Sequence, residues 1–326
     1  MRVNTADWGT EFLVQLYRRY GHELTSLNRV DAFLPRIGKS YAGEERRVLY
    51  LMVRFFAPEV IFEFSPKRGW STLHMAAALE SNGKGRLFSF ELDPVYAWVA
   101  LRVVREAGWA HRVNVVVGDV REELPKVYER LRRRSAIEGI DFVFIDSDHS
   151  AHFAEWYVEN LFPVLNPGAV IHVHDIQASP ERVVMGGQIF PQPTGEERFL
   201  AEYLVSRPKD FRWFSLAELA RNPQYLAAVQ PYGGGQISFP SNRSWPIHPI
   251  DRAAGFERNP ALWIMKLSNQ ETSLYPYRPF VRLAFRARLA YVIRKWIACA
   301  YAPLRERRIA ARRLAKLRRP ESHDAS

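Results

Sequence analysis

Two short stretches of the sequence gather side chains that could carry out acid–base or metal chemistry. They read IDSDHSAH from residue 145 and HVHDIQ from residue 172, and contain Asp146, His149, His174 and Asp175. An imidazole can accept a proton near neutral pH, and carboxylates together with an imidazole form a ligand set suited to a divalent ion. His149 and Asp146 are therefore catalytic candidates, and Asp146, His174 and Asp175 are candidates for a metal site. Without a metal, the same cluster would be an acid–base site.

Both stretches follow apolar runs that favour β-strands. Runs rich in β-branched and aromatic residues alternate with segments long enough for helices, and they cover 60–64, 86–92, 112–119, 140–146 and 169–175. This alternation predicts an α/β fold in which helices cover both faces of a parallel sheet. Ligands bind such sheets outside the carboxyl ends of the strands, so we expect the two stretches to meet at that edge.

The turn after the first of these runs has the sequence EFSPKRGWST, residues 63–72. A glycine lets the backbone approach a ligand, and the N–H groups of a helix start can receive one, so the turn favours a nucleotide-like ligand. The dinucleotide fingerprint G-x-G-x-x-G is absent, because Gly69 is the only glycine of the turn and Ser65 stands four residues before it.

In this turn the sequence resembles the class I S-adenosylmethionine (SAM)-dependent methyltransferases, and within them the bacterial group of macrocin O-methyltransferase and the cephalosporin hydroxylases. That group carries E-x-G-x-x-x-G-x-S-T after the first strand, and this chain departs from the pattern at Ser65. The likeness continues with Glu91 after the second run, Gly118 and Asp119 after the third, FIDSDHS after the fourth and VIHVHDI after the fifth. It covers roughly 44–176, and more weakly extends to about 268.

The resemblance implies a Rossmann-like, doubly wound, mostly parallel sheet with SAM as the cofactor. A carboxylate at Glu91 suits the two ribose hydroxyls, and Asp119 suits the adenine amino group, with a helix cap as its alternative role. Glu63 would receive the cofactor's ammonium group, and Gly69 would leave room for its methionine part. Hydrogen bonding to the backbone is the alternative for the hydroxyl of Thr72. The implied cofactor-binding residues are Glu63, Ser65, Gly69, Thr72, Glu91 and Asp119.

The resemblance also implies two alternative roles for the cluster of Asp146, His149, His174 and Asp175. Several related O-methyltransferases hold Mg²⁺ on acidic residues at this edge, where it orients two substrate oxygens. This chain has His174 where an acidic residue is common, which favours a softer ion or no metal. His149 resembles the general base of the sugar O-methyltransferases in the group, and a cap or a surface position is its alternative role.

Charge is distributed very unevenly along the chain. The net charge is +11, and residues 278–326 carry 14 Lys and Arg against three acidic residues, which leaves the rest neutral. Between Ser135 and Glu181 there is no Lys or Arg. The tail fits a basic amphipathic segment on an anionic membrane surface, with a helix packed on the body as the alternative. No motif indicates specific nucleic-acid binding.

The chain divides into three predicted parts. A helical lead covers 1–58, a SAM-dependent methyltransferase domain covers 59–270 with an irregular substrate-side insertion at 181–260, and a basic tail covers 275–326. The single cysteine, Cys299, excludes an internal disulfide, and no secretory signal is evident, so we expect a cytoplasmic protein with peripheral membrane contact through 278–319.

The predicted activity is O-methylation of a small glycosylated or hydroxyl-rich molecule, with or without metal assistance. Two alternatives use the same fold. One is a cephalosporin-hydroxylase-like enzyme, and the other is a non-catalytic adaptor that docks through its basic tail, because a fold does not fix a reaction.

Overall fold

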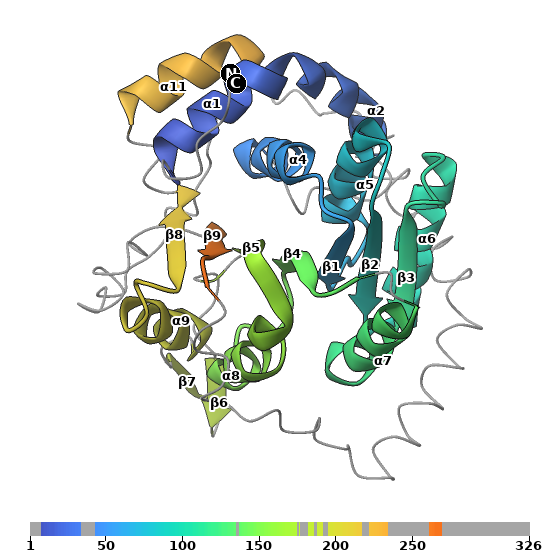
Figure 1. Ribbon diagram of the computed structural model, residues 1–326. Helices are drawn as coiled ribbons and strands as arrows, with labels where there is room; N and C mark the ends of the chain where they lie inside the picture. The colour runs from blue at the N-terminus through green and yellow to red at the C-terminus, as the bar shows by residue number, and fades with distance from the viewer. Residues whose placement is uncertain are drawn as a thin grey trace, which may run out of the picture.

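The central element of the computed structural model is a seven-stranded sheet with the strand order β3-β2-β1-β4-β5-β9-β8 (Figure 1). The structure describes residues 8–33, 43–134, 137–174, 176, 182–185, 188–191, 195–216, 222–233 and 261–268. The strands of the sheet are β1 (Val60–Phe64), β2 (Arg86–Glu91), β3 (Val113–Val117), β4 (Ile140–Ile145), β5 (Leu165–His174), β8 (Phe211–Ser215) and β9 (Ala261–Lys266).

The first five strands pair in parallel, and β9 lies antiparallel between β5 and β8. The chain builds outward from β1 in one direction through β2 and β3, and then in the other through β4 and β5. The strand order therefore reverses between β1 and β4, where ligands bind in such sheets. This arrangement confirms the predicted doubly wound, mostly parallel sheet.

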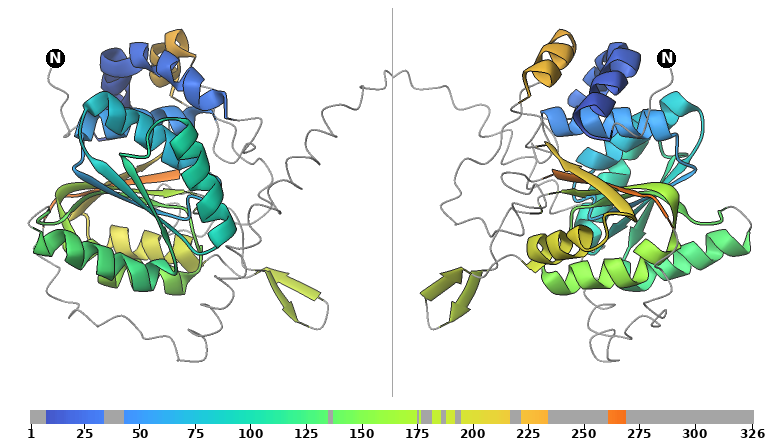
Figure 2. Two further views of the ribbon diagram at one scale, coloured as in Figure 1. Left: turned by 90° about the vertical axis from the view of Figure 1, so that its right-hand side faces the viewer. Right: turned by 60° about the vertical axis from the view of Figure 1, so that its left-hand side comes forward.

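Helices cover both faces of the sheet (Figure 2). On one face lie α4, α5 and α6, with α1, α2 and α11 outside them; the other face is covered by α7, α8 and α9. The helices are α1 (Thr10–Tyr20), α2 (Asn28–Asp31), α4 (Glu44–Phe56), α5 (Trp70–Asn82), α6 (Pro94–Glu106), α7 (Val120–Arg133), α8 (Ala151–Asn160), α9 (Gly195–Val205) and α11 (Pro223–Val229), with short 3₁₀ turns η2 (Gly21–Leu27), η3 (Phe162–Val164) and η4 (Gln230–Tyr232).

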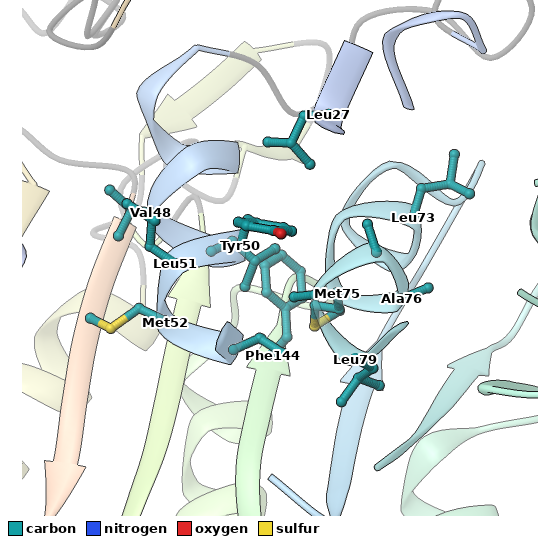
Figure 3. Packing of buried hydrophobic residues seen from close by; sticks show 14 of the residues in the cluster. Leu27, Val48, Tyr50, Leu51, Met52, Leu73, Met75, Ala76, Leu79 and Phe144 are labelled. Carbon is teal, nitrogen blue, oxygen red and sulfur yellow. The ribbon is translucent and has the colours of Figure 1, made fainter. Parts of the chain in front are cut away.

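One hydrophobic core joins the N-terminal helices to the sheet. Figure 3 shows Tyr50 of α4 and Met75 of α5 close together near Phe144 of β4. The same cluster extends through fully buried side chains of α1 as far as β9. The described part of the predicted lead is therefore helical and shares its core with the domain.

Two further regions bear on the predicted organisation. Within the predicted insertion, β6 (Arg182–Met185) and β7 (Gln188–Pro191) form a separate antiparallel pair. Among the described residues, no helix is long and apolar enough to span a membrane. The tail lies outside the described residues, so its contact with a membrane stays a prediction, as do the domain boundaries.

Strand β1 places the carboxylate of Glu63 in the interior of the protein. All five of its residues are buried, as expected for a central parallel strand that is covered on both faces. Four of them are apolar and the fifth is Glu63, which is fully buried. A buried carboxylate requires hydrogen-bond donors, and those donors lie in the first turn of α5 and in the neighbouring strand β2.

Candidate active site

A small pocket lies at the carboxyl ends of the first four strands. Its volume is about 120 Å³, and the loops after β1, β2, β3 and β4 line it together with one residue of α8. The lining includes Ser65, Phe90, Leu92, Gly118, Asp119, Val120, Arg121, Ser147, Asp148 and Phe153. The parallel sheet thus brings strand ends that are far apart in the sequence to one place.

Glu63 lies beneath this edge and receives three hydroxyl donors. Ser71 donates to Oε1 at 2.5 Å, Thr72 donates to Oε2 at 2.8 Å, and Ser89 of β2 also donates to Oε2. Burial raises the pKa of Glu63 to about 7, although the three hydrogen bonds act in the opposite direction. The hydroxyl of Thr72 therefore bonds the Glu63 carboxylate, not the backbone, and ties α5 to β1.

The loop between β1 and α5 contains three residues with a left-handed backbone. Ser65 has φ 60°, Lys67 has φ 52° and Gly69 has φ 89°. Ser65 occupies the place of the first glycine in the class pattern and adopts a conformation that costs a non-glycine residue roughly 1 kcal/mol. A Cβ at Gly69 would lie 2.9 Å from Cγ2 of Val103, so this glycine allows α5 to pack against α6.

Glu91 ends β2 and connects two loops. Its carboxylate accepts hydrogen bonds from the backbone N–H of Lys67 and of Asp93, both at 2.9 Å. Burial raises the pKa of Glu91, and these two hydrogen bonds lower it in part. The next residue, Leu92, is 54% exposed and lines the pocket.

The walls of this pocket are partly apolar and partly polar. Leu92 is one of two large apolar side chains exposed among the described residues, and a flat base would cover it. Phe90, Val120 and Phe153 add apolar wall, while the carboxylate of Glu91 at the end of β2 can accept further hydrogen bonds from hydroxyl groups. The pocket thus combines apolar walls with a few polar groups, as small-molecule sites do.

Asp119 caps a helix and also lines the pocket. Its side chain accepts from the backbone N–H of Arg121 at 2.9 Å as the N-cap of α7, and its Oδ2 lies 2.7 Å from Nη2 of Arg121. This ion pair raises the pKa of the Arg121 guanidinium, against burial. The alternative role expected from the sequence, a helix cap, is thus present, and no sequence motif predicted that Arg121 would lie beside the pocket.

His149 is held by a carboxylate from a distant helix. Its Nδ1 lies 2.7 Å from Oε2 of Glu196, which stands in the first turn of α9 and is fully buried. The Tyr157 hydroxyl donates to Oε1 of Glu196 at 3.0 Å. Burial raises the pKa of Glu196, and His149 followed by Tyr157 lowers it in part. With Nδ1 directed to a carboxylate, the basic atom of a neutral His149 ring is Nε2.

His174 lies between two carboxylates at the end of β5. Its Nδ1 is 3.4 Å from Oδ1 of Asp146, and its Nε2 is 3.2 Å from Oε2 of Glu45 at the start of α4. Burial alone would lower the pKa of His174, but Asp146 and then Glu45 outweigh it and raise the pKa well above its ordinary value. Burial would raise the pKa of Asp146, but the charge and hydrogen bond of His174 lower it. The two carboxylates therefore favour the charged, imidazolium form of the His174 ring.

This arrangement bears on the predicted metal centre. A protonated ring with a carboxylate beside each nitrogen does not fit the role of a metal ligand, which requires a neutral imidazole. Among the described residues, no group of three or more His, Cys, Asp and Glu side chains could hold a metal ion. Asp175 lies outside the described residues. Asp146 and His174 are thus brought together, and the metal itself stays a prediction.

Several residues of the site gave no signal in the sequence. Glu196 follows His149 by 47 residues, and its surroundings, GEER, are those of any helix start with acidic residues in the first turn. Glu45 has a similar setting in EERR at the start of α4. Only the three-dimensional fold brings these carboxylates to the histidines.

Parts of this chain are similar to known proteins. Residues 66–176 match the family model described as a methyltransferase domain. Catechol O-methyltransferase of Niastella koreensis is 28% identical over 173 residues, which cover 52% of this chain and 72% of that protein. Catechol O-methyltransferase of Mycobacterium tuberculosis is 30% identical over 161 residues, which cover 49% of this chain and 64% of that protein. The solved O-methyltransferase TomG from Streptomyces achromogenes, in complex with SAM, is 20% identical with a TM-score of 0.47, and the alignment covers 80% of this chain and 91% of that chain.

The strand order is that of a Rossmann-like, doubly wound sheet. Together with the match over residues 66–176 and the O-methyltransferase relatives, it confirms the predicted class I SAM-dependent methyltransferase domain. The similarity to the two curated relatives spans about half of this chain. The particular activity and its acceptor are therefore matters of proposal, and the narrower likeness to macrocin O-methyltransferase and the cephalosporin hydroxylases stays a prediction.

Proposed function

We propose that this chain transfers a methyl group from SAM to a hydroxyl oxygen of a small molecule, with His149 as the general base. The observation that carries the proposal is the contact of His149 with the buried Glu196, on a loop whose Ser147 and Asp148 line the pocket that fits the adenosyl group. A base at that position would stand beside the cofactor site. The O-methyltransferase relatives favour oxygen as the acceptor atom.

The roles of the residues follow from the hydrogen bonds. Nδ1 of His149 donates to Glu196, so Nε2 accepts the proton that the acceptor hydroxyl loses. Glu196 stabilises the resulting imidazolium through its negative charge. When bound, SAM supplies an electrophilic methyl group on a sulfonium and becomes a neutral thioether after transfer. A positioned general base contributes about 10²–10⁴-fold to such a reaction.

The proposed acceptor is a small glycosylated or hydroxyl-rich molecule. Phenols belong in the same test, because relatives are named catechol and caffeoyl-CoA O-methyltransferases. Metal assistance is the second candidate mechanism, and it would rest on Asp146 and Asp175 without His174. Turnover that survives exhaustive EDTA treatment supports the metal-free base. Turnover that is lost and then restored by Mg²⁺ supports the metal.

Methyl transfer from labelled SAM is the test that separates this function from its alternatives. We expect the full-length protein to bind SAM in calorimetry and to transfer label to one or more members of a panel of sugars, glycosides, catechols and hydroxycinnamoyl esters. A hydroxylase-like enzyme would give oxidised and unlabelled product. An adaptor would bind SAM and label nothing.

The role of His149 is tested with His149→Asn. We expect turnover to fall by about 10²–10⁴-fold while SAM affinity stays unchanged, because the base is lost and the adenosyl pocket is not. His152→Asn is the matched control, since His152 is an exposed histidine of α8 whose nearest charged partner is Glu155. Full activity of His149→Asn would remove His149 from the mechanism.

A further inference from the structure

We propose that Glu196 is the positioning residue of His149: it fixes the tautomer in which Nδ1 carries the hydrogen and Nε2 carries the basic lone pair. The catalytic meaning of this assignment rests on the proposed function. The tautomer itself is a property of the folded protein and does not depend on which acceptor the enzyme uses.

The contact between the two residues is reciprocal. Oε2 of Glu196 lies 2.7 Å from Nδ1 of His149, and the backbone N–H of Glu196 donates to the backbone carbonyl of His149 at 3.2 Å. One contact fixes the ring and the other fixes the loop that carries it. Two hydrogen bonds between the same pair of residues leave the ring little freedom to turn about χ1 and χ2.

Tyr157 fixes the carboxylate in turn. Its hydroxyl donates to Oε1 of Glu196 at 3.0 Å, which leaves Oε2 directed at the histidine. Tyr157 is fully buried, and burial followed by the charge of Glu196 raises its pKa well above the ordinary value, so the hydroxyl stays a donor. The Tyr157 ring packs between Phe153 and Phe162, with ring centroids 5.7 Å apart in each case. The carboxylate is thus held by a rigid support.

Charge decides which tautomer forms. A carboxylate only accepts hydrogen bonds, so a neutral imidazole that faces it through Nδ1 must place its hydrogen there. Glu196 stands in the first turn of α9, where the helix dipole favours a negative group. In serine proteases, replacing the equivalent carboxylate by an amide leaves the geometry intact but gives the wrong tautomer, and turnover falls about 10⁴-fold.

A purely structural role is the competing explanation, because Glu196 also joins α9 to the loop before α8. The two roles differ in what Glu196→Gln does. A glutamine keeps the size and can keep hydrogen bonds to His149 and Tyr157, so a structural joint survives. It can also donate through its amide, so the fixed preference for hydrogen on Nδ1 is lost.

The test uses full-length protein labelled with ¹⁵N-histidine, and two-bond ¹H–¹⁵N NMR spectra assign the tautomer of each ring. The His149 signals are identified by their absence in His149→Asn. We expect the Nδ1–H form in the natural protein and a loss of that preference, with hydrogen on Nε2, in Glu196→Gln. Glu155→Gln is the matched control, because Glu155 lies 3.6 Å from Nδ1 of the exposed His152, and it should leave His149 unchanged.

Glu196→Ala provides a second variant if the glutamine variant does not fold. It removes the acceptor altogether, so the preference for hydrogen on Nδ1 should be lost. A folded Glu196→Gln or Glu196→Ala with His149 still wholly in the Nδ1–H form would overturn the proposal. The NMR measurement needs no acceptor, so a protein that methylates nothing would refute the proposed function and leave this assignment standing.

Where the panel yields an acceptor, kinetics add an independent readout. We expect Glu196→Gln to lower kcat by at least 10-fold with an unchanged dissociation constant for SAM. An unchanged kcat in a variant whose tautomer has shifted would show that Glu196 does not act through His149.

Discussion

The carboxyl edge of the sheet has two halves, one at the ends of β1 and β2 and one at the ends of β4 and β5. The carboxylates of the two halves have different kinds of hydrogen-bond and charge partners. At β1 and β2, Glu63 and Glu91 are surrounded by neutral donors, namely hydroxyls and backbone N–H groups. At β4 and β5, the carboxylates of Asp146 and Glu196 lie against His174 and His149. Burial raises the pKa of both carboxyls in the first half, whereas in the second half His174 lowers that of Asp146.

This difference has a consequence for ligands. The hydrogen bonds to Glu91 come from neutral backbone N–H groups, so the charge of this carboxylate, when it is ionised, is available to a positively charged ligand. SAM carries a sulfonium and an ammonium group and no phosphate, which suits such a site. In the second half His174 lies against Asp146 and favours its ionised form, so the negative charge there has a partner within the protein. One edge of one sheet thus provides two electrostatic environments, one for a cation and one for acid–base chemistry.

The largest effect should come from Glu63, through the pH dependence of stability. Its pKa is about 7 in the folded protein against 4.5 ordinarily, so the folded state binds more protons between these values. Stability from this group is therefore present at low pH and lost as the pH rises toward 7. Between pH 5 and pH 8 the loss is roughly 2–3 kcal/mol. Glu63→Gln cannot ionise and should not show it.

Urea unfolding of both proteins at pH 5 and pH 8 measures this effect. The free energy of unfolding of Glu63→Gln, relative to the natural protein, should rise between the two pH values. Asp146 has the opposite sign: its lowered pKa contributes stability that is lost only as the pH falls through the folded value. If the difference in free energy of unfolding between the two proteins stays the same at pH 5 and pH 8, the ionisation of Glu63 does not change in this range. Burial would then not raise the pKa of Glu63 as expected.

The next effect concerns SAM itself and Glu91. Glu91→Gln keeps the side-chain volume and a carbonyl acceptor but removes the charge that a bidentate contact with ribose would use. SAM affinity should fall by about 1.5–3 kcal/mol, measured by calorimetry. Glu59→Gln is the control, because Glu59 precedes β1 at the opposite edge and pairs with Lys84 on the surface. Unchanged affinity in Glu91→Gln would remove Glu91 from the cofactor site.

The sequence predicted one half of this edge much better than the other. Glu63, Glu91 and Asp119 were identified because each lies at or near the carboxyl end of a strand, and strands are recognised from local patterns. The partners of the histidines were not found. Glu45 and Glu196 lie in helix starts that resemble many others, and only the packing of α4 and α9 brings them to His174 and His149.

The same limit applies to the sheet. Five parallel strands alternate regularly with helices, and that alternation was visible. The position of β9 between β5 and β8 depends on antiparallel pairing across about 90 residues of sequence, as in the pair of His172 with Trp263. Such pairing is decided by which apolar faces remain uncovered once the rest has folded, and no local pattern encodes it.

The smallest effect should come from Ser65, at the junction of the two halves. Its backbone is left-handed, with φ 60°, and its N–H donates to the carbonyl of Phe90 at 2.8 Å, so the loop holds the conformation in place. Ser65→Gly removes the steric cost of about 1 kcal/mol, while the greater freedom of glycine in the unfolded chain offsets part of that gain. We expect a stability gain of under about 1 kcal/mol in urea unfolding. Ser81→Gly is the control: Ser81 lies in the last turn of α5 and its hydroxyl contacts that of Tyr50 at 3.1 Å, so this variant should instead be destabilised. Ser65 also lines the pocket, so the loss of its Cβ should leave SAM affinity equal or slightly higher. Weaker SAM binding by Ser65→Gly would mean that the serine hydroxyl contacts the cofactor, and the first half would then bind SAM through a neutral donor as well as through its carboxylates.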